Sequence, residues 1–422
     1  MENLTYIKAG KLYNGLDEGL HEGWKVLVKG NVIAEVGPEV AQPDSARVVD
    51  LSHLTVTPGM IDGHIHLDNW DWRTIRDEVY FTSEEMKVLG IANAAKKTLQ
   101  RGFTTVRHMG GITSKGLGVL DVKECINSGR LEGSRIIAAP LFLCSPGSHG
   151  DLSQSLSRNP ELSRHAEHGV PTIGSGADFF VNAVREMVKY GADFFKIMST
   201  GGFFTPNDTP EQRQLNDAEL KAIIETAHEY GKTVTSHTYT PALMQTLVNF
   251  GIDGIEHGAL MDEETAALIE DKGVYIVPTF SPYVEAIRYD PVAMANKQPE
   301  FRAKLEKYRD WLAKSHEIIL ASKIKLGFGS DFVAVHQNYD SGWEYQAWLR
   351  SKQNPFRALA AATRVNAEIL GLSDKLGTLE PGKLADIAGW KRDLMTDELA
   401  LLDCGYVMKD GVEYEPETCA EL

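Results

Sequence analysis

The sequence predicts an α/β fold, a (β/α)8 TIM-like barrel with a small β-sandwich domain built from both ends of the chain. Two observations predict it. Between residues 58 and 375, apolar strand-like runs alternate with helical patterns, as they do in repeated parallel β/α units. Five of those runs end in residue types that bind metals, and a barrel gathers the carboxyl ends of its strands on one face.

The two ends of the chain have a different pattern. Residues 6–13 and 24–36 alternate apolar and polar side chains and are separated by glycine turns. The tail repeats this alternation in residues 406–412, which contain an Asp-Gly hairpin signal. We therefore expect one small β domain formed by residues 1–57 and 376–422. Residues 58–375 are expected to form the barrel.

The first barrel run carries two histidines, in Ile61-Asp-Gly-His-Ile-His66. A strand turns successive side chains to opposite faces, so His64 and His66 share a face, about 6 to 7 Å apart, and can bind one ion together. The alternative for any isolated His-X-His is a pair on a solvated strand face. The flanking residues 54–57 and 60–61 are apolar or β-branched, which places this pair at the end of a buried strand.

A lysine lies inside another apolar run, Gly191-Ala-Asp-Phe-Phe-Lys-Ile-Met198. If Lys196 is buried, charged and unpaired, it costs several kcal/mol, so it should lose its proton or acquire a partner. A neutral amine can add carbon dioxide, and the resulting carbamate has two oxygens able to bridge two cations. The alternative is a lysine that pairs with a neighbouring acid or lies at the solvent-exposed end of the strand.

Three further apolar or β-branched runs end in a side chain that can bind a metal, namely His237, His257 and Asp331. A satisfied core histidine or a capping aspartate would explain any one of them alone. Their recurrence at successive strand ends favours a shared site, because unrelated core residues have no reason to gather there.

At these strand ends the chain resembles the amidohydrolase superfamily, in its binuclear branch with a carboxylated lysine. It is most similar to prolidase-like and imidazolonepropionase-related members. The motifs that carry the resemblance are residues 57–66, 102–107, 195–202, 236–241, 255–258 and 329–331, and they occur in the family's order. One departure is His108, which follows Arg107 where the family often has aspartate.

The resemblance implies a role for each ligand. His64 and His66 would hold the more buried metal, Lys196 would be the carboxylated bridge, and His237 and His257 would hold the second metal. Asp331 would bind the first metal and handle the proton of the bridging hydroxide. The cofactors implied are two divalent ions, taken as zinc, and carbon dioxide as the carbamate on Lys196.

Two other residues are candidates for substrate contact. His149 lies in a glycine-rich loop, and its position resembles a family histidine near the substrate carbonyl. Tyr239 matches a tyrosine that reaches the substrate carboxylate in prolidase-like members. The alternatives are a loop-stabilising histidine and a packing tyrosine. Thr200-Gly-Gly202 could offer backbone N–H groups to an anion.

Composition indicates an ordinary enzyme. The chain has 422 residues, 43% of them hydrophobic, and four cysteines without metal-type spacing. Neither a signal peptide nor an apolar stretch of roughly 20 residues is apparent, so we expect a cytoplasmic protein without a membrane partner. A net charge of −16 argues against nucleic acid. The expected partner is a small molecule carrying a carboxylate, and a homo-oligomer is left open.

The resemblance implies a metal-dependent hydrolase of C–N amide bonds in dipeptides or N-acyl amino acids, with Asp331 as the proton carrier. The alternative is a cyclic amide, carbamate, urea or other xenobiotic-like substrate at the same site. A deaminase is disfavoured because Lys196 is present and no acid closely follows His237, and intact ligands disfavour a non-catalytic scaffold. Residues 288–316 are either an insertion over the site mouth or an outer helix.

Overall fold

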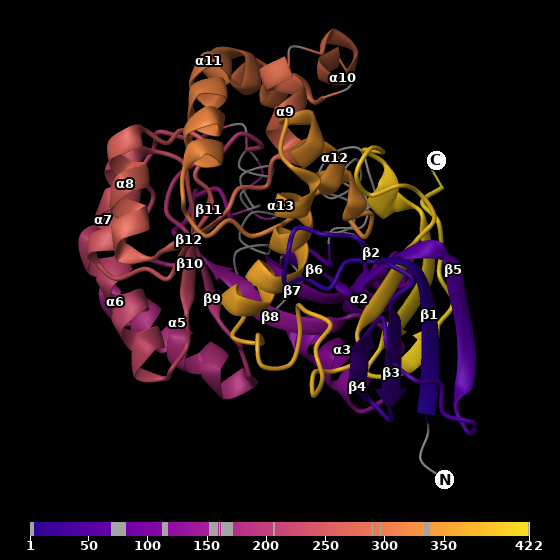
Figure 1. Cartoon of the computed structure of the whole chain (residues 1–422). Helices are drawn as coiled ribbons and strands as arrows, with labels where there is room; N and C mark the ends of the chain where they lie inside the picture. The colour runs from indigo at the N-terminus through magenta and orange to yellow at the C-terminus, as the bar shows by residue number, and fades with distance from the viewer. Residues whose placement is uncertain are drawn as a thin grey trace.

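The computed structural model describes residues 4–68, 82–111, 117–151, 159, 161, 172–205, 207–288, 290–295, 297–332, 338–420 and 422. These residues form two sheets, one of seven parallel strands that curves into a nearly closed barrel and one of eight strands beside it (Figure 1). The predicted combination of an α/β barrel with a separate β unit is therefore present.

The barrel strands are short runs of mostly apolar and β-branched residues that are almost wholly buried. Each strand is parallel to the next one in chain order, as expected for repeated β/α units. The strands are β6 (Met60–Ile65), β7 (Phe103–Gly111), β8 (Arg135–Leu143), β9 (Phe195–Met198), β10 (Val234–Thr238), β11 (Gly254–His257) and β12 (Tyr275–Val277).

An extended segment closes most of the gap between β12 and β6. Gly327 N–H donates to the Ile276 carbonyl at 2.8 Å on one side, and on the other Gly63 N–H donates to the Phe328 carbonyl at 2.8 Å. The segment thus occupies the eighth position of the barrel, although only an isolated bridge is assigned to it. It delivers Asp331 to the carboxyl ends of the other strands.

Helices cover the outside of the barrel between its strands (Figure 1). They are α2 (Glu84–Gln100), α3 (Leu117–Asn127), α5 (Ala177–Tyr190), α6 (Asp217–Glu229), α7 (Pro241–Asn249) and α8 (Glu263–Lys272). Their ends follow the usual rules: α6 begins at a capping box between Asn216 and Glu219, and α5 ends at Gly191 with φ of 99°. After the closing segment come α12 (Gly342–Arg350), α13 (Pro355–Ala360), a π-helical turn (Ala361–Val365) and α14 (Asn366–Ile369).

Three helices form the upper part of the molecule in Figure 1. They are α9 (Ser281–Arg288), α10 (Pro291–Ala295) and α11 (Pro299–Ala321), and they include most of the segment for which an insertion or an outer helix was expected. Leu305 and Tyr308 of α11 belong to one apolar cluster with Phe203 and Tyr239, which lie just past the ends of β9 and β10. The segment is therefore part of the wall beside the strand ends.

The second sheet contains strands from both ends of the chain, drawn in indigo and yellow in Figure 1. Its order is β15-β14-β13-β5-β1-β3-β4, with β2 paired to β1. The strands are β1 (Leu4–Leu12), β2 (His21–Glu22), β3 (Lys25–Lys29), β4 (Val32–Gly37), β5 (Arg47–Pro58), β13 (Ile387–Trp390), β14 (Cys404–Lys409) and β15 (Val412–Tyr414). A 3-10 turn (Ala400–Leu402) precedes β14.

This sheet curls on itself instead of forming the two stacked sheets that the predicted sandwich implies. The chain before β13 returns to the β4 edge, where Gly382 N–H donates to the Ile33 carbonyl at 2.8 Å and Ala385 N–H to the Asn31 carbonyl at 2.9 Å. A single apolar cluster fills the curl. The predicted domain boundaries stay a prediction.

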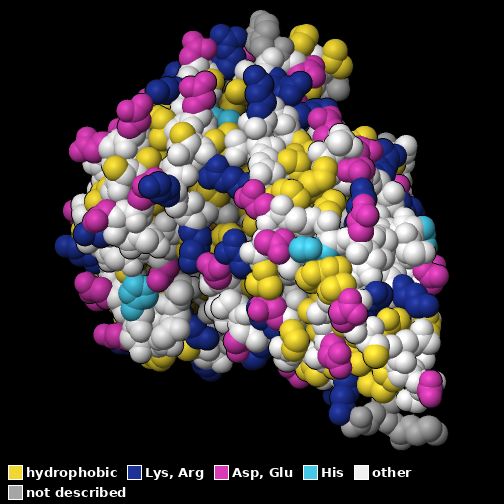
Figure 2. All heavy atoms as spheres, in the orientation of Figure 1, with side chains coloured by type: hydrophobic (Ala, Val, Ile, Leu, Met, Phe, Trp, Pro, Cys, Tyr) yellow, Lys and Arg dark blue, Asp and Glu magenta, His cyan; other side chains and the backbone are white. Residues whose placement is uncertain are grey.

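A half-buried arginine ties the two sheets together. Arg135, the first residue of β8, donates to Asp386 at 2.9 Å and to Asp410 at 2.6 Å, both of which belong to the second sheet's C-terminal strands and turns. The surface seen in Figure 2 intersperses acidic and basic side chains. No helix in the described part of the chain combines the length and apolar character needed to cross a membrane.

Candidate functional site

All six predicted ligands lie at the same end of the barrel. His64 is in β6 and His66 follows it, and His257 is the last residue of β11. The other three are Lys196 in β9, His237 in β10 and Asp331 after the closing segment. Lys196 lies further from the strand ends than His237, because its register partner in β10 is Thr235, two residues before His237.

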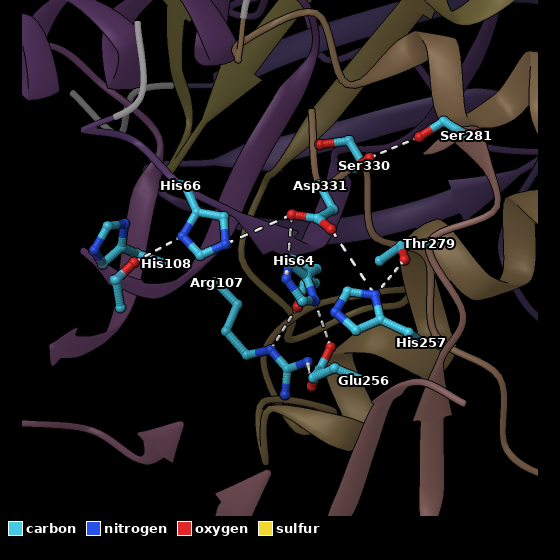
Figure 3. Close-up of polar contacts among 12 residues, drawn as sticks. His64, His66, Arg107, His108, Glu256, His257, Thr279, Ser281, Ser330 and Asp331 are labelled. Carbon is cyan, nitrogen blue, oxygen red and sulfur yellow. Dashed lines mark hydrogen bonds and ion pairs between the residues drawn. The ribbon is translucent and has the colours of Figure 1, made fainter. Parts of the chain in front are cut away.

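Three of the ligands form a tight group around one carboxylate oxygen (Figure 3). Nε2 of His64 and Nε2 of His66 lie 3.5 and 3.6 Å from the same Oδ1 of Asp331. One possible ligand atom from each of the three residues lies within 4.8 Å of the other two. Among the described histidines, cysteines and acids, this is the group that meets the spacing of a metal site.

The hydrogen bonds behind the imidazoles determine which nitrogens face the group. His66 Nδ1 lies 2.7 Å from the Gly110 carbonyl and His64 Nδ1 lies 2.6 Å from a Glu256 oxygen, so both Nδ1 atoms donate. Both Nε2 atoms then carry lone pairs and face a carboxylate oxygen, which is also an acceptor. Such a set of nitrogen and oxygen acceptors fits a bound divalent cation such as zinc.

A second pair of histidines extends the group. The rings of His237 and His257 are 4.8 Å apart, and His257 lies 5.1 Å from the His64 ring. His257 Nδ1 is 2.7 Å from the Thr279 hydroxyl and 3.8 Å from Oδ2 of Asp331. The structure therefore joins both predicted histidine pairs around Asp331.

The backbone is strained at this site. Of the five described non-glycine residues with positive φ, three lie here: His257 at 70°, Thr279 at 47° and Asp331 at 45°. Each such conformation costs about 1–3 kcal/mol and persists only where the surroundings impose it. Contacts among the site residues accompany the strain: Asp331 N–H donates to the His64 carbonyl at 2.9 Å, and the Thr279 hydroxyl lies 2.7 Å from His257 Nδ1. Such strain is typical of functional sites.

Burial controls the protonation of these groups. It lowers the pKa of His64, His237 and His257 well below the usual value, and the nearby Lys196 ammonium lowers them further. Burial also lowers the pKa of Lys196, whereas Glu256 and Asp331 oppose this. Neutral imidazoles and a readily deprotonated lysine are the forms that metal ligation and carbamate formation require.

A buried ion pair lies beneath the ligands and was not predicted from the sequence. Arg107 in β7 donates to Glu256 Oε1 at 2.7 Å, while Glu256 Oε2 holds His64 (Figure 3). Arg107 also donates to the Gly63 carbonyl at 2.6 Å and to the Tyr275 hydroxyl at 2.8 Å. The available signal was two opposite charges inside apolar strand runs, because a buried charge requires a partner.

Asp62 was also not predicted to be a site residue, and it fixes the loop that carries Asp331. Its Oδ1 accepts N–H groups of His64 at 2.9 Å and Ser330 at 3.1 Å. Its Oδ2 accepts the hydroxyls of Ser330 and Ser341, both at 2.6 Å. Asp62 thus sets the position of Asp331 relative to the end of β6.

Both predicted substrate contacts lie against the second histidine pair. His149 stacks on His237 with ring centroids 4.4 Å apart, and Tyr239 stacks on His257 at 5.3 Å. The Tyr239 hydroxyl is 2.6 Å from that of Tyr283 in α9. Burial raises the pKa of both hydroxyls, so they stay protonated, and one of their two protons is left for another acceptor.

One other expectation changes. The N–H groups of Thr200 and Gly201 already donate to the carbonyls of His237 and Gln212, so they are not available to an anion as expected. His108, the departure from the family pattern, accepts the Leu67 N–H at 3.2 Å and thereby holds the chain just after His66.

Comparisons with known proteins agree with this geometry. The amidohydrolase family profile matches residues 55–412, most of the chain. The chain belongs to the amidohydrolase family. The resemblance to the amidohydrolase superfamily and its prolidase-like members is confirmed, and the protein is a hydrolase that acts on carbon–nitrogen bonds.

Several relatives span nearly the whole chain. Ochratoxinase from Aspergillus niger is 25% identical over 408 residues, 93% of this chain and 82% of that protein. A solved Xaa-Pro dipeptidase with methionine bound in its active site is 28% identical with a TM-score of 0.84, and the match covers 98% of this chain and 100% of that one. A prolidase complexed with N-methylphosphonate-L-proline is 26% identical with a TM-score of 0.82 and the same coverage.

We expect Glu256→Gln to weaken zinc binding by about 10- to 100-fold, because the His64 imidazole loses the anion that orients it. The neutral amide also leaves the Arg107 charge buried without a counterion. Competition with a chromogenic chelator measures the affinity.

Glu219→Gln is the matched control. Glu219 is also a buried carboxylate, but it serves the capping box of α6 and accepts the Gly176 N–H at 2.8 Å. Equal zinc affinity in Glu256→Gln and Glu219→Gln would show that the ion pair does not support the ligand.

Proposed function

We propose that this amidohydrolase cleaves amide bonds in dipeptides or N-acyl amino acids, using two divalent metal ions. The observation that carries the proposal is the acceptor-only group of His64, His66 and Asp331, next to buried Lys196 and the second histidine pair. The similar Xaa-Pro dipeptidase and prolidase support the choice of substrate.

Each ligand has one role in the proposal. His64, His66 and Asp331 would hold one zinc ion, and His237 and His257 would hold the other. Lys196, as its carbamate, would bridge the two. The low exposure of Lys196, 1%, supports the carbamate, because a buried neutral amine is the form that adds carbon dioxide.

Bound zinc would supply an activated water molecule and polarise the scissile carbonyl. The Asp331 carboxylate would take a proton from the attacking water and pass it to the leaving nitrogen. Burial raises the pKa of Asp331, and nearby Glu256 and Asp62 raise it further, whereas Lys196 lowers it. A carboxyl with a raised pKa holds a proton more readily between those two transfers.

The substrate would be fixed by Tyr239, Tyr283 and His149, which lie beside the second histidine pair. The free proton of the Tyr239 and Tyr283 hydroxyl pair would donate to the substrate carboxylate, and His149 would contact the carbonyl region. Both tyrosines are at most 3% exposed, so such a hydrogen bond would form out of bulk water, where it is stronger.

The alternative substrate is a cyclic amide, carbamate, urea or other xenobiotic-like compound. It would use the same ligands and differ only in the side chains that line the pocket. Similarity to ochratoxinase, whose name states a toxin as its substrate, supports a xenobiotic-like compound. The two proposals differ in whether the substrate needs a free carboxylate.

A substrate screen tests the proposed function. We expect zinc-loaded protein to hydrolyse some members of dipeptide and N-acyl amino acid libraries, with amidated versions turned over much more slowly. Ureas, carbamates and cyclic amides form the comparison set. Turnover confined to that comparison set would contradict the proposal and favour the alternative.

Lys196→Ala is expected to abolish activity and lower the zinc content from about two ions per chain. Removing the bridging anion leaves two cations close together without charge between them, which neutral imidazoles cannot offset. Elemental analysis and activity, each measured with and without short carboxylic acids, check this. Full activity and two ions in the variant, without additives, would exclude the carbamate.

Tyr239→Phe should raise the KM of carboxylate substrates about tenfold, since a hydrogen bond to a charged group contributes roughly 1.5 kcal/mol. The kcat should change little, because this bond forms before the transition state. Steady-state kinetics on matched carboxylate and amidated substrates measure both constants.

Tyr308→Phe is the control, because Tyr308 belongs to the same apolar cluster but its hydroxyl donates to Glu211 instead. Its KM should match that of the wild type. If Tyr239→Phe impairs carboxylate and amidated substrates equally, Tyr239 does not bind the carboxylate.

A further inference from the structure

His149 is held by a polar network that reaches from the site to helix α11. Its Nδ1 lies 2.9 Å from the Thr205 hydroxyl and 3.4 Å from Oδ2 of Asp208. The Thr205 hydroxyl in turn donates to Oδ1 of Asp208. Lys304 of α11 lies 3.1 Å from the same Oδ1, so the network ends on a cation.

The ammonium of Lys304 uses all three of its protons on one loop. Besides Asp208, it donates to the carbonyls of Gly202, at 2.8 Å, and Thr205. Burial opposes the charge on Asp208, but hydrogen bonds from His149 and Thr205 and the charge of Lys304 outweigh it and lower the pKa of Asp208. Asp208 is therefore an anion that can only accept hydrogen bonds.

The protons of this network can be assigned one by one. Thr205 has a single hydroxyl proton, and it donates this proton in a hydrogen bond to Asp208. The Thr205 oxygen must then accept from His149, which places a proton on Nδ1 of the imidazole. Both side-chain contacts of His149 go to Nδ1, so Nε2 is the nitrogen left for a ligand.

We infer that Asp208 and Lys304 are positioning residues for His149: they fix its ring orientation and keep its proton on Nδ1, so that Nε2 is presented to the substrate. Within the described part of the chain, neither residue forms a hydrogen bond or ion pair with any of the six predicted metal ligands. Their effect passes through Thr205 and His149, whose ring stacks on His237.

The packing around His149 supports the same role. Its backbone N–H donates to the Gln214 side chain at 2.9 Å, which fixes the main chain. A Cβ built on Gly202 would lie 2.2 Å from Cε1 of His149, so this position must stay glycine for the ring to fit. The imidazole is thus restrained by its backbone, by Gly202 and by Asp208.

The functional part of this inference rests on the proposed function, because it takes His149 as a contact of the substrate carbonyl region. The protonation part does not, since it depends only on contacts within the protein. The two parts are therefore tested by different measurements.

Nitrogen-15 NMR of zinc-loaded, histidine-labelled protein tests the protonation. The His149 signal is assigned by its loss in His149→Gln, and we expect a proton on Nδ1 in the wild type. Asp208→Asn and the isosteric Thr205→Val should each shift that signal towards a mixture of tautomers. A neutral ring protonated at Nε2 in the wild type, or a signal unchanged in both variants, would overturn the inference.

Kinetics test the effect on catalysis. Lys304→Met should lower kcat/KM about 10- to 100-fold, the range for a misplaced contact group, with zinc content unchanged. Lys314→Met is the matched control on the same helix, where Lys314 is 60% exposed and pairs with Glu263.

The outcomes separate the two proposals. A wild type that cleaves no amide in the libraries contradicts the proposed function, while the NMR result still decides the protonation of His149. Equal kinetics in Lys304→Met and Lys314→Met on a good substrate, with an unshifted His149 signal in Lys304→Met, would overturn the positioning role.

Discussion

The site depends on one buried carboxylate, Asp62, which joins the end of β6 to the loop after the closing segment. Its four hydrogen bonds fix His64 and Ser330 together, and Asp331 N–H adds a bond to the His64 carbonyl at 2.9 Å. Asp331 directly follows Ser330, so these bonds also fix its position. Its carboxylate faces the Nε2 atoms of His64 and His66. Without this tie, the acceptors would repel each other and separate.

The gathering of the six predicted ligands at one end of the barrel could be expected from the sequence, because each of these residues belongs to a local pattern. His64, His237 and His257 close short apolar runs, and parallel strands bring such run ends together whatever the details of packing. The curled sheet could not be predicted in the same way, since period-two alternation gives strands but not how a sheet bends. The N–H groups of Thr200 and Gly201 were expected to be available to an anion, because the carbonyls that accept from them come from elsewhere in the chain.

The supporting contacts were missed for a related reason. Glu256 meets Arg107 across 149 residues, and Lys304 meets Asp208 across 96. No spacing rule connects such distant positions, so a single sequence indicates that a buried charge needs a partner without naming the partner. Only the three-dimensional arrangement identifies it.

The buried charges behind the ligands do not make the fold more stable than apolar residues of similar size would. Their value lies in holding imidazoles in one orientation before any ligand arrives, which lowers the cost of binding. The strained backbone at His257, Thr279 and Asp331 likewise adds no stability and holds these residues in one arrangement. In this barrel, strain and buried charges at the strand ends lower the stability of the fold, and the apolar cluster between strands and helices offsets that loss.

Two of the three acceptors of Lys304 are main-chain carbonyls, those of Gly202 and Thr205. A main-chain acceptor remains when the side chain of its residue changes. Phe203 and Phe204 lie between these two carbonyls, and both contact α11, through Tyr308 and Phe301 respectively, so polar and aromatic contacts together hold the loop on this helix. A mutation at either phenylalanine therefore removes an aromatic contact with α11 but leaves the two main-chain acceptors of Lys304 in place.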